Sequence, residues 1–255
     1  MCGFGYVCRK EEHYKIPDHL KHSSSNELEQ TQKPKEVTFE EESMSCCVGI
    51  VDIVNSTAVT AKLVNGQLAK YYSTFLNTMA DVVRDFCAIV VKNIGDSLLY
   101  YFPETSHTDK KTAFRNVLEC SRTMIEYHTA LNEVMYNEGL PEINYRISAD
   151  YGNILIGRPS NSPKEDIFGP TVNLCKKINS IAKPNGIVVG GDLYLNVKNL
   201  REYDFNFINT CSSGLKLEYP VYSLMPSKTK NGFNLQGFPI SQTDPDGLPC
   251  RRLLE

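Results

Sequence analysis

Two aspartates at the ends of apolar segments are the first candidates for chemistry. Asp52 interrupts the apolar run VGIVDIVNST near its C-terminal end, and Asp96 lies in KNIGDSLLYYF, between two apolar runs. A carboxylate at the edge of a buried strand needs a partner, because an uncompensated buried charge is costly. Divalent cations prefer oxygen ligands, so two converging aspartates predict a metal site. The alternative interpretation has no metal site: Asp52 is then a turn or capping residue, and Asp96 is an ordinary residue of the hairpin.

The neighbouring residues add features of a phosphate site. Gly95 permits a sharp turn and leaves room for a bulky ligand beside the second aspartate. Asn55, Ser56 and Thr57 follow the first aspartate and are expected to open a helix, whose N-terminal amides would receive phosphate oxygens. Carboxylates beside an amide-rich helix start predict a site for a metal–triphosphate complex.

A third candidate segment, EDIFGPTVNLCKKINSIA, is expected to be a helix that begins at Pro170. Asn173 and Lys177 are four residues apart, so they share one face of that helix. An amide and a cation presented together suit a ribose oxygen and a phosphate. The alternative is an ordinary solvated polar face.

Hydrophobic periodicity predicts the elements that position these residues. Strands are expected at MSCCVGIVDIV, at CAIVVKNIGDSLLYYFP as a hairpin, at INYRISADYGNILIG as two strands joined at residues 151–153, and at IVVGG, FNFINT and YPVYSL. Helices are expected over residues 57–86, over residues 107–137 and from residue 170 to residue 181. This order predicts an α+β fold of the ferredoxin-like type, an antiparallel sheet with helices packed on one face. Arg146 is interpreted as a residue that supports its strand.

Composition places one domain at residues 45–225. Residues 1–44 are rich in Lys, Glu, Gln, Ser and His and are expected to form a flexible extension, and residues 226–255 an irregular tail. Nine cysteines without a CxxC pair are typical of a reduced, cytoplasmic protein. A net charge of −3 argues against nucleic-acid binding. No apolar stretch approaches the roughly 18 residues of a transmembrane helix, and no secretory signal is expected.

Four segments together resemble the class III nucleotidyl cyclases, the catalytic domains of adenylyl and guanylyl cyclases. They are VGIVDIVNST, KNIGDSLLYYF, YRISADYGNILIG and DIFGPTVNLCKKI, in the order that the family has them, and the resemblance covers about residues 46–224. The resemblance implies that Asp52 and Asp96 bind two divalent cations, Mg²⁺ or Mn²⁺. It also implies that Ile53 contributes its backbone carbonyl to one of them.

The same resemblance implies roles for four further residues. Lys92 and Asp166 match the base-recognising pair, which implies adenine because the family's guanylyl cyclases have Glu and Cys there. Asn173 matches the asparagine that orients the ribose. Lys177 stands where the family usually has arginine, and it keeps the positive charge but lacks the planar fork of a guanidinium.

The implied function is an adenylyl cyclase that converts ATP to 3′,5′-cyclic AMP and pyrophosphate at sites shared between the two subunits of a homodimer. Lys177 leaves open an alternative, a weak or inactive cyclase-homology domain that binds nucleotide or a protein partner. The triplet Gly190-Gly191-Asp192 suggests a diguanylate cyclase, but it follows the third helix instead of lying in the central hairpin. These glycines are expected to form a turn at a strand end.

Overall fold

The structure is a computed structural model that describes residues 36–39, 43–107, 111–160, 162, 164–211 and 218–226. Nearly all of the expected N-terminal extension and C-terminal tail lies outside these residues, so the domain boundaries at 44/45 and 225/226 stay predictions. Among the helices in the described residues, none has both the length and the apolar composition of a membrane-spanning segment.

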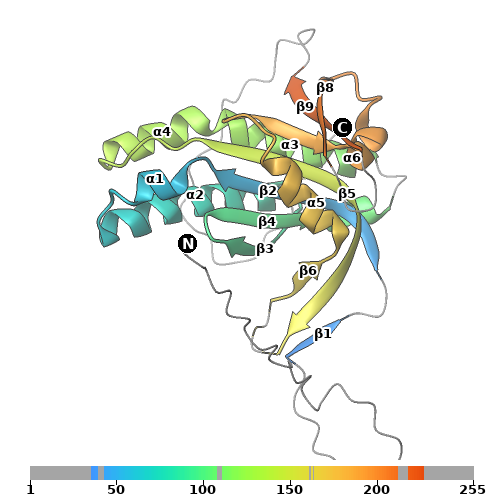
Figure 1. The fold of residues 1–255 in the computed structure, drawn as a ribbon, viewed down its shortest axis with the longest axis horizontal. Helices are drawn as coiled ribbons and strands as arrows, with labels where there is room; N and C mark the ends of the chain where they lie inside the picture. The colour runs from blue at the N-terminus through green and yellow to red at the C-terminus, as the bar shows by residue number, and fades with distance from the viewer. Residues whose placement is uncertain are drawn as a thin grey trace, which may run out of the picture. The chain divides into compact units, whose positions relative to one another are not determined.

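A mixed sheet with antiparallel pairing at all but one junction forms the centre of the fold (Figure 1). Its strands are β1 (Val37–Phe39), β2 (Met44–Ile53), β3 (Ile89–Ile94), β4 (Ser97–Phe102), β5 (Tyr145–Pro159), β6 (Asp166–Phe168), β7 (Ile187–Gly190), β8 (Tyr203–Cys211) and β9 (Tyr219–Pro226). The strand order is β3-β4-β2-β5-β7-β9-β8, and only β5 and β7 are parallel. β1 and β6 pair with the far end of β5 and form an arm with it, which consists of β1, β6 and residues 155–159.

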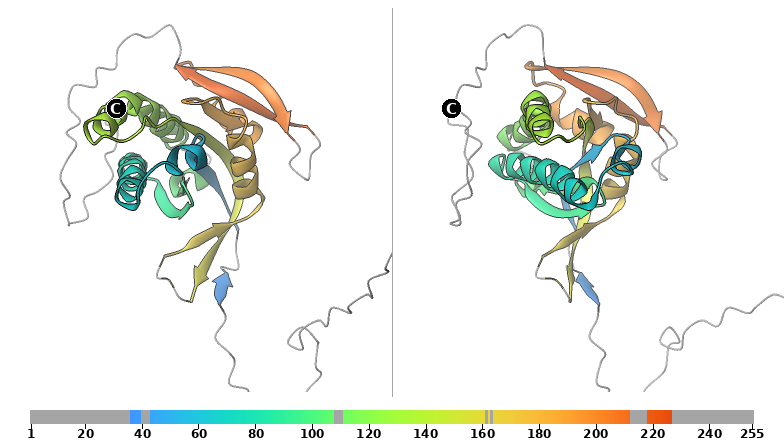
Figure 2. Two further views of the ribbon diagram at one scale, coloured as in Figure 1. Left: turned by 60° about the vertical axis from the view of Figure 1, so that its left-hand side comes forward. Right: turned by 90° about the vertical axis from the view of Figure 1, so that its left-hand side faces the viewer.

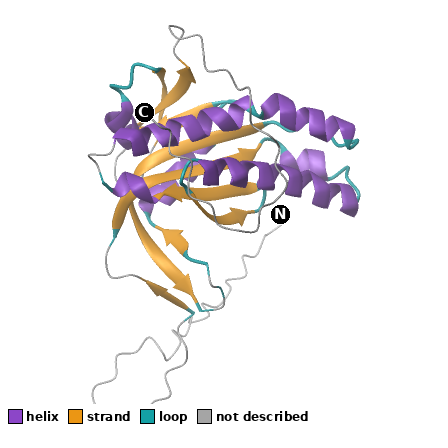
Figure 3. Ribbon diagram, turned by 180° about the vertical axis from the view of Figure 1, so that it is seen from behind, coloured by secondary structure: helices purple, strands orange, loops and turns teal. Residues whose placement is uncertain are grey.

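Helices cover both faces of the sheet, which corrects the expectation of one covered face (Figure 2). They are α1 (Ser56–Thr60), α2 (Asn65–Asp85), α3 (Lys111–Glu126), α4 (His128–Asn137), α5 (Pro170–Asn179) and α6 (Gly191–Val197), with a 3₁₀ helix, η2, at Pro103–Ser106. Figure 3 shows α2, α3 and α4 across one face, and Figure 1 shows α5 in front of the other face. The reason is visible in β2, where neighbouring Cys46 and Cys47 are both fully buried and belong to hydrophobic clusters on opposite faces.

Two of the expected helices are each divided in the structure. The segment expected as residues 57–86 becomes α1 and α2, and α2 begins where Gln67 Oε1 accepts a hydrogen bond from the amide of Val64 at 3.4 Å. The segment expected as residues 107–137 becomes α3 and α4, with an irregularity at Tyr127. Helical hydrogen bonds continue on both sides of Tyr127, so the interruption is local.

The prediction of two strands joined at residues 151–153 is wrong, because β5 is one continuous strand of 15 residues. Gly152 lies in the strand and allows α5 to approach it. A Cβ atom there would lie 2.6 Å from Thr171 Oγ1, which donates a hydrogen bond to the carbonyl of Asn153 at 2.9 Å. Gly190 ends β7 and Gly191 begins α6, a helix that the sequence pattern did not predict.

Candidate active site

The structure brings the two predicted metal-binding aspartates to the same end of neighbouring strands. Antiparallel β2 and β4 place Asp52 opposite Ser97, and Asp96 lies immediately before Ser97 in the β3–β4 turn. Gly95 in this turn has a φ of 65°, which glycine adopts without strain. Burial raises the pKa of Tyr71 on α2 to about 12, and the charge of Asp96 adds to this shift.

Asp52 is held by two partners. Ser97 Oγ donates a hydrogen bond to Asp52 Oδ1, and Arg146 Nη2 donates to Oδ2 at 3.2 Å. Arg146 lies directly opposite Asp52 in the register of β2 and β5. Its Nε atom is buried and has no hydrogen-bond partner among the described residues. Arg146 thus joins β5 to β2 through Asp52, a contact with a predicted site residue that the sequence pattern did not indicate.

The segment after Asp52 turns directly into α1. Asn55 precedes the helix with a φ of 56°, and its carbonyl accepts hydrogen bonds from the amides of Ala58 and Val59 at 3.1 and 3.2 Å. Ser56 and Thr57 form the first turn of this helix, as predicted, but the helix has only five residues. The side chain of Ile53 is buried, so only its main chain is available to a ligand.

Lys92 and Asp166, 74 residues apart in the sequence, form an ion pair between β3 and β6. The carboxylate of Asp166 also accepts a hydrogen bond from the amide of Ile167 at 2.8 Å. A shift in the β3–β4 register between Val90 and Lys92 sets the direction of Lys92. The ammonium of Lys92 lies 5.8 Å from the centre of the Phe168 ring.

Asn173 and Lys177 both lie on the exposed side of α5, while Cys175 on the opposite side is fully buried. The end of the helix is fixed by Asn179, whose amide nitrogen donates to the carbonyls of Ile50 and Arg146 at 3.3 Å each. α5 is thereby anchored on the two strands that carry Asp52 and its arginine partner. Burial raises the pKa of the Cys211 thiol, and the ammonium of nearby Lys177 opposes this shift.

Asp52 and Asp96, at the same end of β2 and β4, offer carboxylate oxygens of the kind that bind divalent cations. In the part of the chain that the structure describes, no group of three or more His, Cys, Asp or Glu side chains could hold a metal ion. Mg²⁺ is commonly bound by one or two carboxylates, with phosphate oxygens and water completing its coordination. Two half-buried aspartates are a donor set of that kind.

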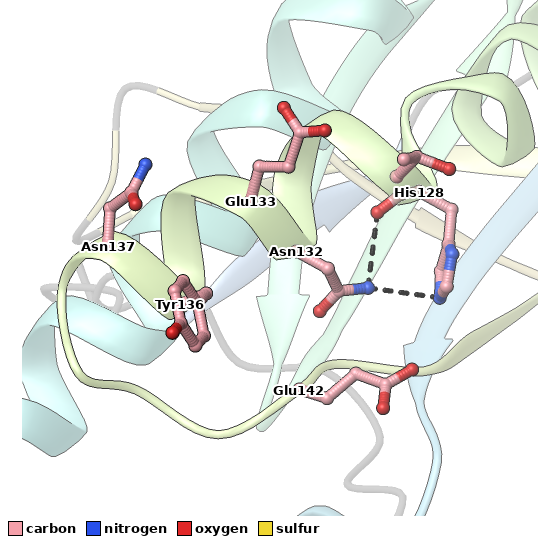
Figure 4. Close-up of a pocket in the computed structure, with 7 residues that line it drawn as sticks. His128, Asn132, Glu133, Tyr136, Asn137 and Glu142 are labelled. Atoms are coloured by element: carbon pink, nitrogen blue, oxygen red, sulfur yellow. Dashed lines mark hydrogen bonds between the residues drawn. The ribbon is translucent and has the colours of Figure 1, made fainter.

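A separate hollow of about 550 Å³ lies along α4, and no residue of the predicted site is among those that line it (Figure 4). There, the side-chain nitrogen of Asn132 lies 3.1 Å from His128 Nε2 and donates to the His128 carbonyl at 3.1 Å. Asn132 also exchanges hydrogen bonds with the backbone of Ile143. These contacts tie α4 to the segment that leads into β5.

Sequence comparison gives the class of protein that this fold and site define. Residues 37–223 match the adenylate and guanylate cyclase catalytic domain, and the chain belongs to that family. An adenylate cyclase from Streptomyces coelicolor is 28% identical over 142 residues, which are 56% of this chain and 31% of that protein. One from Streptomyces griseus is 27% identical over 144 residues, 56% of this chain and 30% of that protein. The chain thus spans about a third of the length of these relatives.

Solved structures share the fold. The adenylyl cyclase CyaB from P. aeruginosa superposes with a TM-score of 0.67 at 17% identity, covering 75% of this chain and 98% of that one. The guanylyl cyclase Cya2 gives a TM-score of 0.66 at 18% identity, covering 74% of this chain and 96% of that one. The predicted α+β cyclase fold is confirmed, and the roles of single residues stay predictions.

Proposed function

We propose that this chain is an adenylyl cyclase that converts ATP to 3′,5′-cyclic AMP and pyrophosphate. The observation that carries the proposal is the pairing of Lys92 with Asp166. A lysine donates to the ring nitrogen acceptor of adenine, and an aspartate accepts from its exocyclic amine. Guanine presents the opposite pattern on that edge, so the pair favours ATP over GTP. The curated relatives named above carry the same activity in their names.

The metal half of the site consists of Asp52, Asp96 and the backbone carbonyl of Ile53, which would hold two Mg²⁺ or Mn²⁺ ions. The ions would lower the pKa of the ribose 3′-hydroxyl and neutralise charge on the phosphates. Arg146 donates a hydrogen bond to Asp52 Oδ2 at 3.2 Å, and its guanidinium would offer a positive charge to the triphosphate if Asp52 held a cation instead. Backbone amides of residues 56 and 57, with the open space at Gly95, accommodate the phosphates.

In the reaction, the 3′-oxygen attacks the α-phosphorus and forms the new ester bond. The bond from the α-phosphorus to the bridging oxygen breaks, pyrophosphate leaves, and the 3′-proton passes to solvent. Asn173 orients the ribose, and Lys177 stabilises charge that develops on the phosphate. Because lysine offers one ammonium group in place of a guanidinium fork, the stabilisation by Lys177 is weaker than that by arginine.

We propose that the metal half and the base half of each site come from different subunits of a homodimer. Lys92 and Asp96 lie in one hairpin, yet Lys92 is directed to β6 while Asp96 lies at the turn beside Ser97. A two-fold axis would complete both sites equivalently.

Product formation from ATP and from GTP with Mn²⁺ tests the proposal. We expect cyclic AMP as the main product, and Asp52→Asn should lower its rate by at least about a hundredfold. Asp204→Asn is the matched control, because Asp204 is an exposed aspartate on β8. Cyclic GMP as the main product would refute adenine specificity. ATP binding without turnover, with activity gained in Lys177→Arg, would instead support the nucleotide-binding alternative.

A mixing experiment tests the shared sites. Asp52→Asn lacks the metal half and Asp166→Asn lacks the base half, so each variant alone should be inactive. If subunits exchange at random in an equal mixture, half of the dimers contain one subunit of each variant. In such a mixed dimer, one site combines the two intact halves and the other combines the two defective halves. The mixture should therefore regain about a quarter of the wild-type activity. If no activity returns although the subunits exchange, the sites are not shared.

A further inference from the structure

β1 forms one edge of the arm, across β5 from β6, the strand that carries Asp166. Phe39 pairs with Gly157 of β5 from one side, and Asp166 of β6 pairs with the same glycine from the other. The arm is therefore a small three-stranded sheet in which Gly157 separates the N-terminal strand from the aspartate that pairs with Lys92 (Figure 1).

Two aromatic rings meet over this glycine. The rings of Phe39 and Phe168 have centroids 5.2 Å apart and planes inclined at 72°, an edge-to-face contact. A Cβ atom at Gly157 would lie 2.7 Å from Phe168 Cε2 and 3.2 Å from Phe39 Cε1. The absence of a side chain at Gly157 is what allows the two rings to come together.

Phe168 connects this contact to the Lys92–Asp166 pair. It lies two residues after Asp166, so both side chains point to the same face of β6. The ammonium of Lys92 lies 5.8 Å from the centre of the Phe168 ring while it pairs with Asp166. A continuous series of contacts thus runs from Phe39 through Phe168 to Lys92.

Phe39 is 53% exposed and belongs to none of the buried hydrophobic clusters. Removal of the Phe39 side chain therefore leaves the buried clusters intact, and its effect on the site would be transmitted by the contact with Phe168. Its contact with Phe168 limits the orientations of that ring and, through it, of Lys92.

We propose that Phe39 is a positioning residue for recognition of the nucleotide base, acting through Phe168 on the Lys92–Asp166 pair. The inference rests on the proposed function of that pair. It gives the strand β1 a role in substrate affinity.

Steady-state kinetics with ATP tests this role. Phe39→Ala should raise KM for ATP about three- to tenfold and leave kcat within about twofold, because the base contributes to binding and not to the reacting atoms. Phe39→Tyr keeps the ring and should restore KM. Phe207→Ala is the matched control, since Phe207 is 59% exposed on β8 and makes its own edge-to-face contact with Tyr222 at 5.9 Å.

An unchanged KM in Phe39→Ala, or an equal rise in Phe207→Ala, overturns the inference. Titration calorimetry with ATP separates it from the proposed function. If wild type binds ATP but does not turn it over, the cyclase proposal fails, and the change in dissociation constant in Phe39→Ala still decides the role of Phe39. If wild type binds no ATP, both proposals fail.

Discussion

The carboxyl group of Asp150 should make the stability of this domain depend on pH. Its side chain is fully buried, and Tyr219 Oη donates to both of its oxygens at 2.9 Å. The amides of Tyr151 and Leu193 also donate to it, at 2.8 and 3.4 Å. These neutral donors do not offset the loss of water, so burial raises the pKa of Asp150 to about 7, and the charge of Asp192 adds to the shift.

The sign and size of the effect follow from linkage. An aspartate in the unfolded chain has a pKa of about 3.9, so between about pH 4 and pH 7 the folded protein binds the proton more tightly than the unfolded chain. Stability from this group is fully present below about pH 4 and is lost as the pH rises to about 7. A difference of one pKa unit corresponds to about 1.4 kcal/mol. The free energy of unfolding contributed by Asp150 therefore falls by roughly 4 kcal/mol in total as the pH rises from below about 4 to above about 7.

Urea unfolding of wild type and Asp150→Asn at several pH values from 5 to 8 measures this contribution. Asparagine is neutral throughout, so the free energy of unfolding of wild type should fall relative to the variant by about 2 to 3 kcal/mol between pH 5 and pH 7. Parallel curves for the two proteins would refute the reasoning. As a second test, Tyr219→Phe removes the hydroxyl donor, should raise the pKa of Asp150 further, and should extend the decline to higher pH.

Three further predictions concern single side chains. Gly190→Ala places a Cβ atom 2.3 Å from the carboxyl group of Asp150, so urea unfolding should show a loss of about 2 kcal/mol or more. Lys177→Arg should raise kcat for ATP by about tenfold, because a guanidinium fork binds phosphate through two hydrogen bonds, and an unchanged kcat would contradict this. Ser97→Ala removes the hydroxyl donor to Asp52, so the Mn²⁺ concentration for half-maximal activity should change by about threefold or more, with Ser73→Ala as the exposed control.

The elements that carry Asp52 and Asp96 are predictable from the sequence because their signals are local. The apolar run of β2, the two runs on either side of Gly95, and Pro170 at the start of α5 each mark an element without knowledge of its neighbours. β1 and α6 cannot be predicted in this way, because strands and helices of three and seven residues are too short for a periodic pattern. Gly152 resembles a turn residue in the sequence, because the helix that packs on it is remote along the chain.

Contacts between strands explain what the sequence did not predict at the site. Arg146 reaches Asp52 only because β5 pairs with β2 in one particular register. The same holds for Phe39 and Phe168, which meet because both of their strands border Gly157. Such pairings are set by the whole sheet and have no signature within a single segment.

The extra residue in β3 has a consequence for engineering this domain. Because the register shift between Val90 and Lys92 fixes where the lysine points, the hairpin tolerates exchange of its exposed side chains better than a change in its length. Deleting one residue would close the irregularity, and the residues that move would turn to the opposite side of the strand. Attempts to alter substrate preference are therefore better made by substitution in this hairpin than by shortening or lengthening it.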